Sequence, residues 1–427
     1  MAPLKALGGT RDILPEEAER WQRLEDQARR LFHLYGYAEI RTPLIEEAAV
    51  FTGSLGEAAE IVTKQMYLFQ DRGGRQVALR PEGTASVVRA FIEHGLDRTA
   101  SLTKLFYIGP MFRAERPQKG RQRQFHQVGV EVFGPASPYQ DVETLLLLTR
   151  LLKDWGIEGW TLSLNALGCR ADRPAIVRYL RERLTPDRER LCEDCKLRLE
   201  KNPLRILDCK EPECYALSGK IDVVTATCSG CQKHFGQVTD TLRMLKVPFE
   251  RDPHLVRGLD YYTRTAFEVV HGDLGSQNAL GGGGRYDDLV EQLGGASVPA
   301  VGFAIGLERI LMVQQAARAA SSAAREDSLK VFVATVTAAQ IPEGLKLVET
   351  LRSSGVSSVV NTEDRPLKRQ FEQAAKLVAS GCVLILGEDE VAKGVVTRKD
   401  MATGKQDQLP RSVVVEELRR WLDAGKS

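Results

Sequence analysis

The chain has 427 residues, with 59 basic and 57 acidic side chains and a net charge of +2. This length exceeds one ordinary hydrophobic core and predicts two or three domains. The near-zero net charge excludes a uniformly basic surface, so a nucleic-acid partner would have to bind local basic patches. No apolar run approaches the roughly 18 residues of a membrane span, so no membrane partner is expected. Eight cysteines without a secretory signal favour a reduced, cytoplasmic protein.

The N-terminal part predicts a helix followed by an interrupted strand. Pro15 stands at the helix start, and apolar residues recur at helical spacing from Trp21 to Phe32. The strand expected over residues 38–45 contains Pro43, which suits an edge or an interface. Taken alone, these features also describe an ordinary helix–strand pair.

The sequence LRPEGT, at residues 79–84, lies between a predicted strand and a predicted helix over 85–94. A strand-to-helix turn is a usual place for ligand contacts, so Glu82 and Thr84 are candidate ligand-binding residues. The alternative is structural, with Thr84 as the helix N-cap and Glu82 as an ordinary first-turn acid.

Residues 107–134, YIGPMFRAERPQKGRQRQFHQVGVEVFG, predict two strands joined by a long basic loop. Strand alternation places Arg113 and Glu115 on one face, and an arginine held on a strand suits phosphate or carboxylate. On the return strand, alternation groups the side chains of Phe125, Gln127 and Glu131 with Gly129. A solvated basic hairpin is the alternative, but it would not need inward amide and carboxylate groups.

This hairpin closely resembles the second signature motif of class II aminoacyl-tRNA synthetases, in the form found in histidyl-tRNA synthetases. Two later stretches extend the resemblance. RGLDYYTRTAFE, at 257–268, matches a signature of histidyl-tRNA synthetases and their close relatives, and VGFAIGLER, at 301–309, resembles the third class II motif. The N-terminal helix and strand then correspond to the first motif, which builds a homodimer interface in that class.

The resemblance covers essentially the whole chain and implies an α+β fold. It implies a class II catalytic core with an antiparallel sheet over 1–169 and 251–325, interrupted by a helical insertion domain over 170–250. A C-terminal α/β anticodon-binding domain would occupy 326–427. The alternating strand and helix patterns beyond residue 330 independently predict a mixed α/β domain there.

The family's activity is that of a histidine–tRNA ligase, so the resemblance implies L-histidine, ATP and tRNA(His) as partners and Mg²⁺ as cofactor. Arg113 and Arg257 would be the catalytic cations at the α-phosphate and the substrate carboxylate. The implied histidine-binding residues are Glu82, Thr84, Arg113, Gln127, Glu131, Arg257, Tyr261, Tyr262 and Tyr286. The implied ATP-binding residues are Arg113, Glu115, Arg121, Phe125 and Arg309. These residue types suit the activation of histidine by ATP. The ammonium group of the amino acid needs oxygen acceptors, and phosphoryl transfer needs clustered positive charge.

Two other functions are compatible with parts of this sequence. A non-catalytic regulatory paralogue of histidine biosynthesis shares the catalytic core, but such proteins typically lack the C-terminal domain and lose active-site arginines. This chain has residues 330–427 and keeps Arg113, Arg257 and Arg309, which favours the ligase. A general RNA-binding module would leave the inward-facing carboxylates without a role.

Cysteines gather between residues 170 and 250 as Cys192-x2-Cys195, Cys209-x4-Cys214 and Cys228-x2-Cys231. Two CxxC pairs are a usual zinc-binding pattern, which predicts a structural zinc held by Cys192, Cys195, Cys228 and Cys231. Reduced structural thiols are the alternative, because histidyl-tRNA synthetases as a class need no metal. The spacing leaves both interpretations open.

Overall fold

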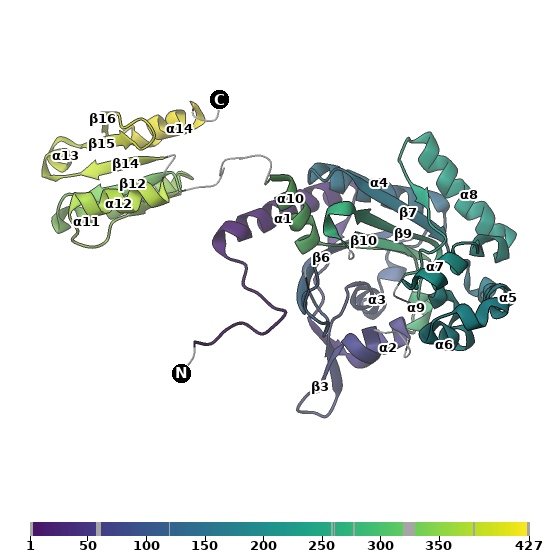
Figure 1. The fold of residues 1–427 in the computed structure, drawn as a ribbon. Helices are drawn as coiled ribbons and strands as arrows, with labels where there is room; N and C mark the ends of the chain where they lie inside the picture. The colour runs from purple at the N-terminus through teal and green to yellow at the C-terminus, as the bar shows by residue number, and fades with distance from the viewer. Residues whose placement is uncertain are drawn as a thin grey trace. The chain divides into compact units, whose positions relative to one another are not determined.

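A computed structural model of the chain describes residues 3–56, 61–118, 120–257, 259, 261–275, 278–318, 329–378 and 381–424. The chain divides into two compact units, residues 1–322 and 323–427, and each has its own sheet (Figure 1). Among the described residues, no helix has the length and apolar character needed to span a membrane.

The first unit is built on an eight-stranded sheet with the order β1-β5-β6-β11-β10-β9-β7-β8. Its strands are β1 (Ala38–Glu39), β5 (Thr103–Phe112), β6 (Gln124–Phe133), β11 (Ala300–Gly306), β10 (Ala279–Arg285), β9 (Thr263–His271), β7 (Trp160–Ala166) and β8 (Glu250–Arg251). The pairs β1–β5 and β7–β8 are parallel, and the remaining pairs are antiparallel. This sheet confirms the predicted α+β class.

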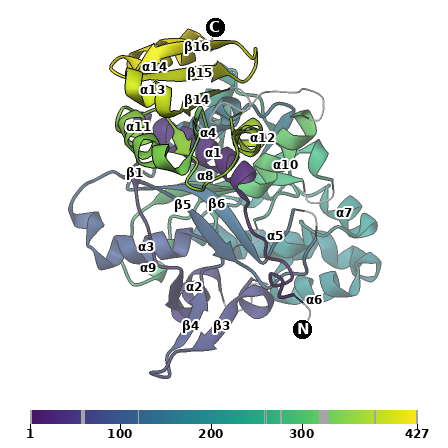
Figure 2. The same cartoon turned by 90° about the vertical axis from the view of Figure 1, so that its left-hand side faces the viewer.

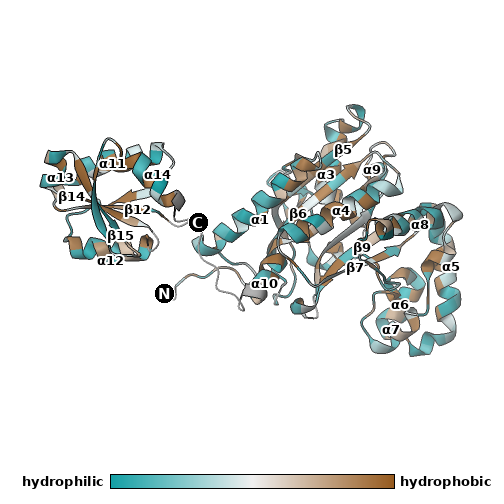
Figure 3. Cartoon of the chain, turned by 90° about the horizontal axis from the view of Figure 1, so that it is seen from above, coloured by the Kyte–Doolittle hydropathy of each residue, from teal (hydrophilic) through white to brown (hydrophobic). Residues whose placement is uncertain are grey.

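Strand alternation gives the two faces of this sheet different roles. On β6, Val128, Val130 and Val132 point to one face and are buried with residues of four helices. These helices are α1 (Pro15–Leu34), α4 (Pro138–Asp154), α8 (Ser229–Met244) and α10 (Leu307–Arg318), of which α1 and α4 are seen from outside in Figure 3. The intervening residues Gln127 and Glu131 face the opposite side, so β6 delivers its polar groups away from the main core.

The second face is covered by α2 (Ala48–Leu55), α3 (Thr84–Glu93) and α9 (Leu289–Gln292). Their apolar residues cluster with aromatic side chains of the sheet and its loops, including Tyr107 of β5 and Tyr286 after β10. Figure 1 shows α3 and α9 below the sheet, opposite α1 and α4. This smaller core supports the space in which the polar groups of β6 converge.

The strand expected over residues 38–45 is in fact two short strands in different sheets. β1 pairs with β5, whereas β2 (Ile45–Glu47) pairs with β4 (Gln76–Leu79) in a three-stranded sheet completed by β3 (Tyr67–Gln70). Pro43 lies between β1 and β2, where its missing N–H and fixed φ prevent a continuous ladder. β1 ends at Glu39, before the proline, so the expected single strand is replaced by two strands separated by residues 40–44.

A buried arginine ties β10 to α4. Arg285 has no exposed surface, and its Nε donates to Asp141 Oδ1 at 2.6 Å. Asp141 Oδ2 also accepts from Thr265 Oγ1 at 2.6 Å and contacts His234 Nε2 at 2.7 Å. A second carboxylate, Asp287, accepts from Arg285 Nη1 at 2.8 Å. Each buried charge therefore has several partners, which offsets its desolvation.

Between β7 and β8 the chain forms short helices with a separate apolar cluster (Figure 1). These are α5 (Arg173–Leu184), α6 (Glu193–Lys201) and α7 (Pro212–Ser218), joined by 3₁₀ turns and followed by α8. The long α8 instead presents Phe235, Val238 and Leu242 to the core of the eight-stranded sheet. It thereby connects the helical segment to the sheet.

The second unit has a five-stranded sheet with the order β13-β12-β14-β15-β16. Its strands are β12 (Val331–Thr335), β13 (Ser358–Val360), β14 (Cys382–Leu386), β15 (Val395–Asp400) and β16 (Gln406–Pro410). Helices α11 (Ile341–Ser353) and α14 (Val414–Ala424) pack on one face and α12 (Leu367–Leu377) on the other, and Figure 2 shows α11 and α12 on either side of the sheet. The mixed α/β pattern is confirmed, although β16 and α13 (Glu388–Lys393) were not expected.

Candidate active site

A cavity of about 550 Å³ opens on the face of the eight-stranded sheet that carries Gln127 and Glu131. This volume is in the range of sites for small ligands, roughly 300–1,000 Å³. Its lining includes all the residues predicted to bind histidine or ATP: Glu82, Thr84, Arg113, Glu115, Arg121, Phe125, Gln127, Glu131, Arg257, Tyr261, Tyr262, Tyr286 and Arg309. Residues far apart in the sequence therefore meet around one space.

Glu131 lies at the buried end of this cavity, with only 1% of its surface exposed. Its Oε1 accepts a hydrogen bond from Thr84 Oγ1 at 2.7 Å, and its Oε2 accepts one from the hydroxyl of Tyr286. Burial raises the pKa of Glu131 to about 8, although both hydrogen bonds oppose that rise. Near neutral pH this carboxyl can therefore hold or release a proton, which suits a basic ligand group.

The turn before α3 contradicts the predicted structural role of Thr84 as N-cap but gives Glu82 a structural role at the start of the helix. Thr84 is not the N-cap: Gly83 holds that position, and the Thr84 hydroxyl is directed to Glu131. The two oxygens of Glu82 accept from the backbone N–H groups of Thr84 and Ala85, each at 2.7 Å. Glu82 thus provides acceptors for backbone N–H groups that have no partner within the helix. Burial raises the pKa of the Glu82 carboxyl.

Four guanidinium groups surround the other part of the cavity. Arg113 lies over the Phe125 ring at 5.1 Å and donates from Nε to the Pro81 carbonyl at 2.9 Å. Arg121 lies 3.2 Å from a Glu115 oxygen. Arg309 contacts backbone carbonyls, and burial together with the positive charge of Arg121 lowers its pKa. Clustered buried cations are costly without an anion, so this part of the cavity suits phosphate or carboxylate.

Arg257 completes this group from the loop before β9. Its Nη1 donates to Glu268, and its guanidinium lies 5.8 Å from the centre of the Tyr262 ring. Three buried polar atoms of the cavity-lining residues make no hydrogen bond: Arg257 Nε, a donor, and Gln127 Oε1 and Glu115 Oε2, both acceptors. Unsatisfied buried groups are rare, so a donor and two acceptors here indicate that a ligand supplies the missing partners.

The glycine run at residues 281–284 belongs to β10 and is not the flexible linker that its composition alone would allow. A Cβ at Gly282 would lie 2.7 Å from Arg257 Nη1 and 2.6 Å from the Phe267 carbonyl oxygen. On β11, a Cβ at Gly302 would lie 2.0 Å from Glu131 Oε2. Glycine is therefore needed on both strands to leave room for the functional side chains.

The sequence interpretation missed other charged residues of the cavity. Glu268 neutralises Arg257, and Glu308 accepts from the His126 backbone N–H at 2.9 Å. Glu268 could have been found, because it ends the RGLDYYTRTAFE motif and strand alternation separates it from the core residue Phe267. Arg11 and Glu17 also line the cavity, but no local pattern near the N-terminus indicated this.

The predicted zinc ligands do not form one group. Cys192 and Cys195 lie with Cys209 and Cys214, whereas Cys228 and Cys231 lie with Cys169 and Asp172. The two CxxC pairs start different helices, α6 and α8, and this separates them. The expectation of a site formed by both pairs is therefore corrected.

The antiparallel sheet, its helix-covered back and the arginines that the end of β5, two loops and α10 place around the cavity define a class II aminoacyl-tRNA synthetase. The family model described as histidyl-tRNA synthetase matches residues 9–310, and one described as an anticodon binding domain matches residues 330–421. The chain belongs to the histidyl-tRNA synthetase family.

Individual relatives agree with this assignment. A histidine–tRNA ligase of Thermosipho melanesiensis is 42% identical over 98% of this chain and 99% of its own length. The structure of apo S. aureus histidyl-tRNA synthetase covers 98% of this chain and 100% of its own, with 33% identity and a TM-score of 0.82. A Bacillus halodurans protein titled as an ATP phosphoribosyltransferase regulatory subunit/histidyl-tRNA synthetase shares the fold, with 24% identity, a TM-score of 0.60, and coverage of 84% and 92%.

Proposed function

We propose that this protein is a histidine–tRNA ligase. It activates L-histidine with ATP to form histidyl-adenylate and then transfers the histidyl group to the 3′ end of tRNA(His). The observation that carries this proposal is the single cavity in which a buried, proton-holding Glu131 and a group of arginines lie together. Glu131 suits an imidazole, and the arginines suit a nucleotide.

Histidine would lie with its imidazole between Glu131 and Tyr262, beside Tyr261 and Tyr286. Its amino group would bind near Glu82, Thr84 and Gln127, where the unpaired Gln127 oxygen can accept an N–H. A pocket that hydrogen-bonds both ends of a ring rejects apolar isosteres, because they would leave its buried polar groups unpaired.

ATP would bind along the arginine-rich part of the cavity. Phe125 and Glu115 would contact adenine, and Arg121 and Arg309 the outer phosphates and nucleotide. Arg113 and Arg257 would lie at the α-phosphate and the histidine carboxylate. In the activation step a carboxylate oxygen of histidine bonds to the α-phosphorus as the bond to the pyrophosphate oxygen breaks. No proton moves, so the protein acts by alignment and by neutralising charge.

Mg²⁺ is the cofactor expected for this chemistry, and the residues present fit it. Glu268 is a carboxylate beside Arg257 in the cavity, and protein-bound Mg²⁺ usually combines one or two carboxylates with substrate phosphates. Glu268 would hold the ion, which would supply further neutralisation of phosphate charge.

The second unit would bind the anticodon part of the tRNA, as the matching family's description implies. A hollow beside α12 is lined by Arg365, Arg369, Lys376, Gln373 and Glu372. Glu372 pairs with Arg369, but the lining keeps a net positive charge, which suits a phosphate backbone in a chain of low net charge. The proposed domains are a catalytic core over 1–169 and 251–325, an insertion over 170–250 and the anticodon domain over 326–427. We also propose a cytoplasmic homodimer with α1 and the following strands at its interface.

A regulatory paralogue is the second candidate, because the Bacillus halodurans protein shares the fold. That candidate does not explain why Arg113, Arg257 and Arg309 all line the cavity here, or why the chain continues into a second unit. The ligase explains both features.

The test is ATP–pyrophosphate exchange with the purified protein and each of the twenty amino acids in turn. We expect exchange with histidine alone, since the adenylate forms reversibly from the amino acid and ATP. An Arg113→Ala variant should lose this exchange and retain its fold by circular dichroism. A folded wild-type protein that catalyses no exchange with any amino acid would favour the regulatory paralogue and refute the proposal.

A further inference from the structure

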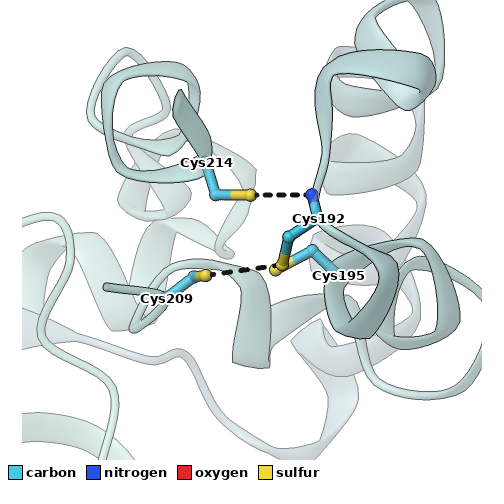
Figure 4. A group of neighbouring side chains, drawn as sticks. All are labelled: Cys192, Cys195, Cys209 and Cys214. Carbon is cyan, nitrogen blue, oxygen red and sulfur yellow. Dashed lines mark hydrogen bonds between the residues drawn. The ribbon is translucent and has the colours of Figure 1, made fainter. Parts of the chain in front are cut away.

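A second group of reactive side chains lies outside the cavity, in the helical segment between β7 and β8. Figure 4 shows the thiols of Cys192, Cys195, Cys209 and Cys214 directed toward one another. Their four sulfur atoms all lie within 4.8 Å of one another, and all four cysteines are free. None of these four cysteines lines the cavity.

The spacing of the sulfurs is that of ligands around one ion. Zinc–sulfur bonds of about 2.3 Å in a tetrahedron place neighbouring sulfurs roughly 3.8 Å apart. The sulfurs of Cys192 and Cys209 are 3.9 Å apart. A multi-iron cluster would separate its cysteine ligands further, because several irons and sulfides lie between them. The group therefore fits a single soft ion with four thiolates, for which zinc is the usual occupant.

The local fold brings the four side chains together from α6, α7 and the chain between them. Cys192 is the N-cap of α6, so Cys195 lies in the first turn of the same helix. Cys214 belongs to α7, and its sulfur accepts a hydrogen bond from the Cys192 backbone N–H at 3.2 Å. Hydrogen bonds to ligand sulfurs are a common outer-shell feature of metal sites, because they stabilise the thiolates and fix their orientation.

The sulfurs also lie where a shared metal ion would join short helices and stabilise their packing. Cys195, Cys209 and Cys214 are buried in the apolar cluster formed by α5, α6 and α7. These helices have 12, 9 and 7 residues, and small assemblies of short helices commonly need a metal or disulfides for stability. Cys382 provides a contrast, since it is a buried thiol of β14 that belongs to neither group of candidate metal ligands.

The second group, Cys169, Asp172, Cys228 and Cys231, is less suited to a metal. Both Asp172 oxygens already accept backbone N–H groups, from Cys169 and from Cys228, each at 3.0 Å. Cys228 is exposed, whereas Cys209, Cys195 and Cys214 of the first group are buried. The carboxylate therefore has a structural role, and this group provides a natural internal control.

We propose that Cys192, Cys195, Cys209 and Cys214 bind one structural Zn²⁺ that joins α6 and α7 and stabilises the segment between β7 and β8. The ligands bind as thiolates, so binding releases their protons to solvent. The ion takes no part in the activation of histidine, and this inference does not depend on the proposed function.

The direct test is the metal content of the full-length protein, purified under reducing conditions from zinc-containing medium. We expect about one zinc per chain, and a native mass spectrum heavier by one zinc less the released protons. Protein reconstituted with Co²⁺ should show the visible absorption of a tetrahedral cobalt–thiolate site. A full-length protein that contains no zinc, contains iron in its place, or has a disulfide within the group overturns the proposal.

Two variants assign the ligands. Cys209→Ser should reduce the zinc content severalfold or more, whereas Cys228→Ser should leave it unchanged. If Cys209→Ser fails to fold, removal of zinc from the wild-type protein with a chelator replaces it, and the melting temperature should fall and recover when zinc is returned. Equal loss of zinc from both variants, or a melting temperature unaffected by chelation, contradicts the assignment.

Discussion

At the scale of single residues, the proposed contact between Glu131 and the imidazole depends on the proton that Glu131 holds. Burial raises the pKa of Glu131 to about 8, while free histidine loses its imidazole proton near pH 6.5. Between these values the free site holds a proton and the free ligand has none. A complex that shares one proton between carboxylate and imidazole then forms without exchange of protons with the solvent.

We therefore predict that histidine affinity has a bell-shaped dependence on pH. Below about pH 6.5 both partners are protonated, so binding must release a proton and weakens as the pH falls. Above about pH 8 both are deprotonated, so binding must take up a proton and weakens as the pH rises. Calorimetric titrations in buffers of different ionisation enthalpy measure the number of protons exchanged on binding, below and above the pH of tightest binding.

The matched control is Glu131→Gln, which keeps the shape of the side chain but has no titrating proton. At neutral pH this variant should bind histidine roughly tenfold more weakly, because a charge-assisted bond worth about 1.5–3 kcal/mol is lost. The decline of affinity above pH 8 that is due to Glu131 should also disappear, while ATP affinity should hardly change. An unchanged histidine affinity, with only a lower melting temperature, would show that Glu131 is structural.

Arg257→Ala should reduce exchange activity by about 10²–10³, or roughly 3–4 kcal/mol, and weaken histidine binding far less. A cation aimed at the transferring phosphoryl group matters most in the transition state. The control is Arg251→Ala, which removes an exposed ion pair with Asp222 and should leave activity unchanged. Exchange within threefold of wild type in Arg257→Ala would remove this residue from the catalytic group.

These residues show how far a sequence can predict a site. Strand alternation and family motifs identified Gln127 and Glu131, because both signals are local. The partners of Glu131 come from a helix start and a distant loop, so no spacing could predict that Thr84 and Tyr286 both bond to it. The prediction of the zinc ligands failed for the same reason. The short distance between the sulfurs of Cys192 and Cys209 depends on the packing of α6 and α7.

At the scale of elements, β10 and β11 form a glycine-lined floor beneath the cavity. The two strands are paired, with Gly284 opposite Gly302, and β11 also pairs with β6 so that Gly302 lies opposite Glu131. Side chains on this surface would fill the space needed by Glu131 and Arg257. Glycine lowers the stability of these two strands, but it leaves room for the functional side chains beside them.

Gly302→Ala should impair histidine binding more than it impairs folding. The added methyl would meet Glu131 Oε2 at 2.0 Å and the Val130 carbonyl oxygen at 2.3 Å, so the carboxylate must move. We expect histidine affinity to fall at least tenfold, and the melting temperature also to fall. Titration of histidine and thermal melting of the same samples provide both measurements.

The control for this substitution is Gly236→Ala in α8, where an added Cβ meets nothing within 4 Å. It should stabilise the protein by about 0.5–1 kcal/mol, because alanine favours a helix interior. Normal histidine affinity in Gly302→Ala would show that Glu131 can shift without loss of function, contrary to the geometry.

Element boundaries were predictable where one local signal was strong. Pro15 and the apolar spacing gave α1 correctly, because both act within the helix itself. Pro43 was recognised, but the separation of β1 and β2 into different sheets depends on partners thirty or more residues away. β16 was missed because Gln406–Pro410 has mostly polar residues, and it is a strand through its pairing with β15.

At the scale of the whole molecule, the two units have separate apolar cores. The first contains clusters on both faces of the eight-stranded sheet, and the second contains clusters on both faces of the five-stranded sheet. All the proposed histidine and ATP contacts belong to the first unit. The proposed division of activation and anticodon recognition between the two units can therefore be tested by separating them.

A protein truncated after residue 322 should retain histidine-dependent exchange within a fewfold and lose most tRNA charging. The cavity keeps its whole lining, so the activation step should persist, whereas charging would lose the contacts of the second unit with tRNA. Both rates are measured on one preparation, with circular dichroism and gel filtration to verify its fold and assembly. A matched full-length variant, Arg369→Ala with Lys376→Ala, neutralises part of the basic hollow on α12 and should raise the KM for tRNA without affecting exchange. An equal fall of exchange and charging in a folded truncation would show that the two units act as one, because each step would then require residues from both.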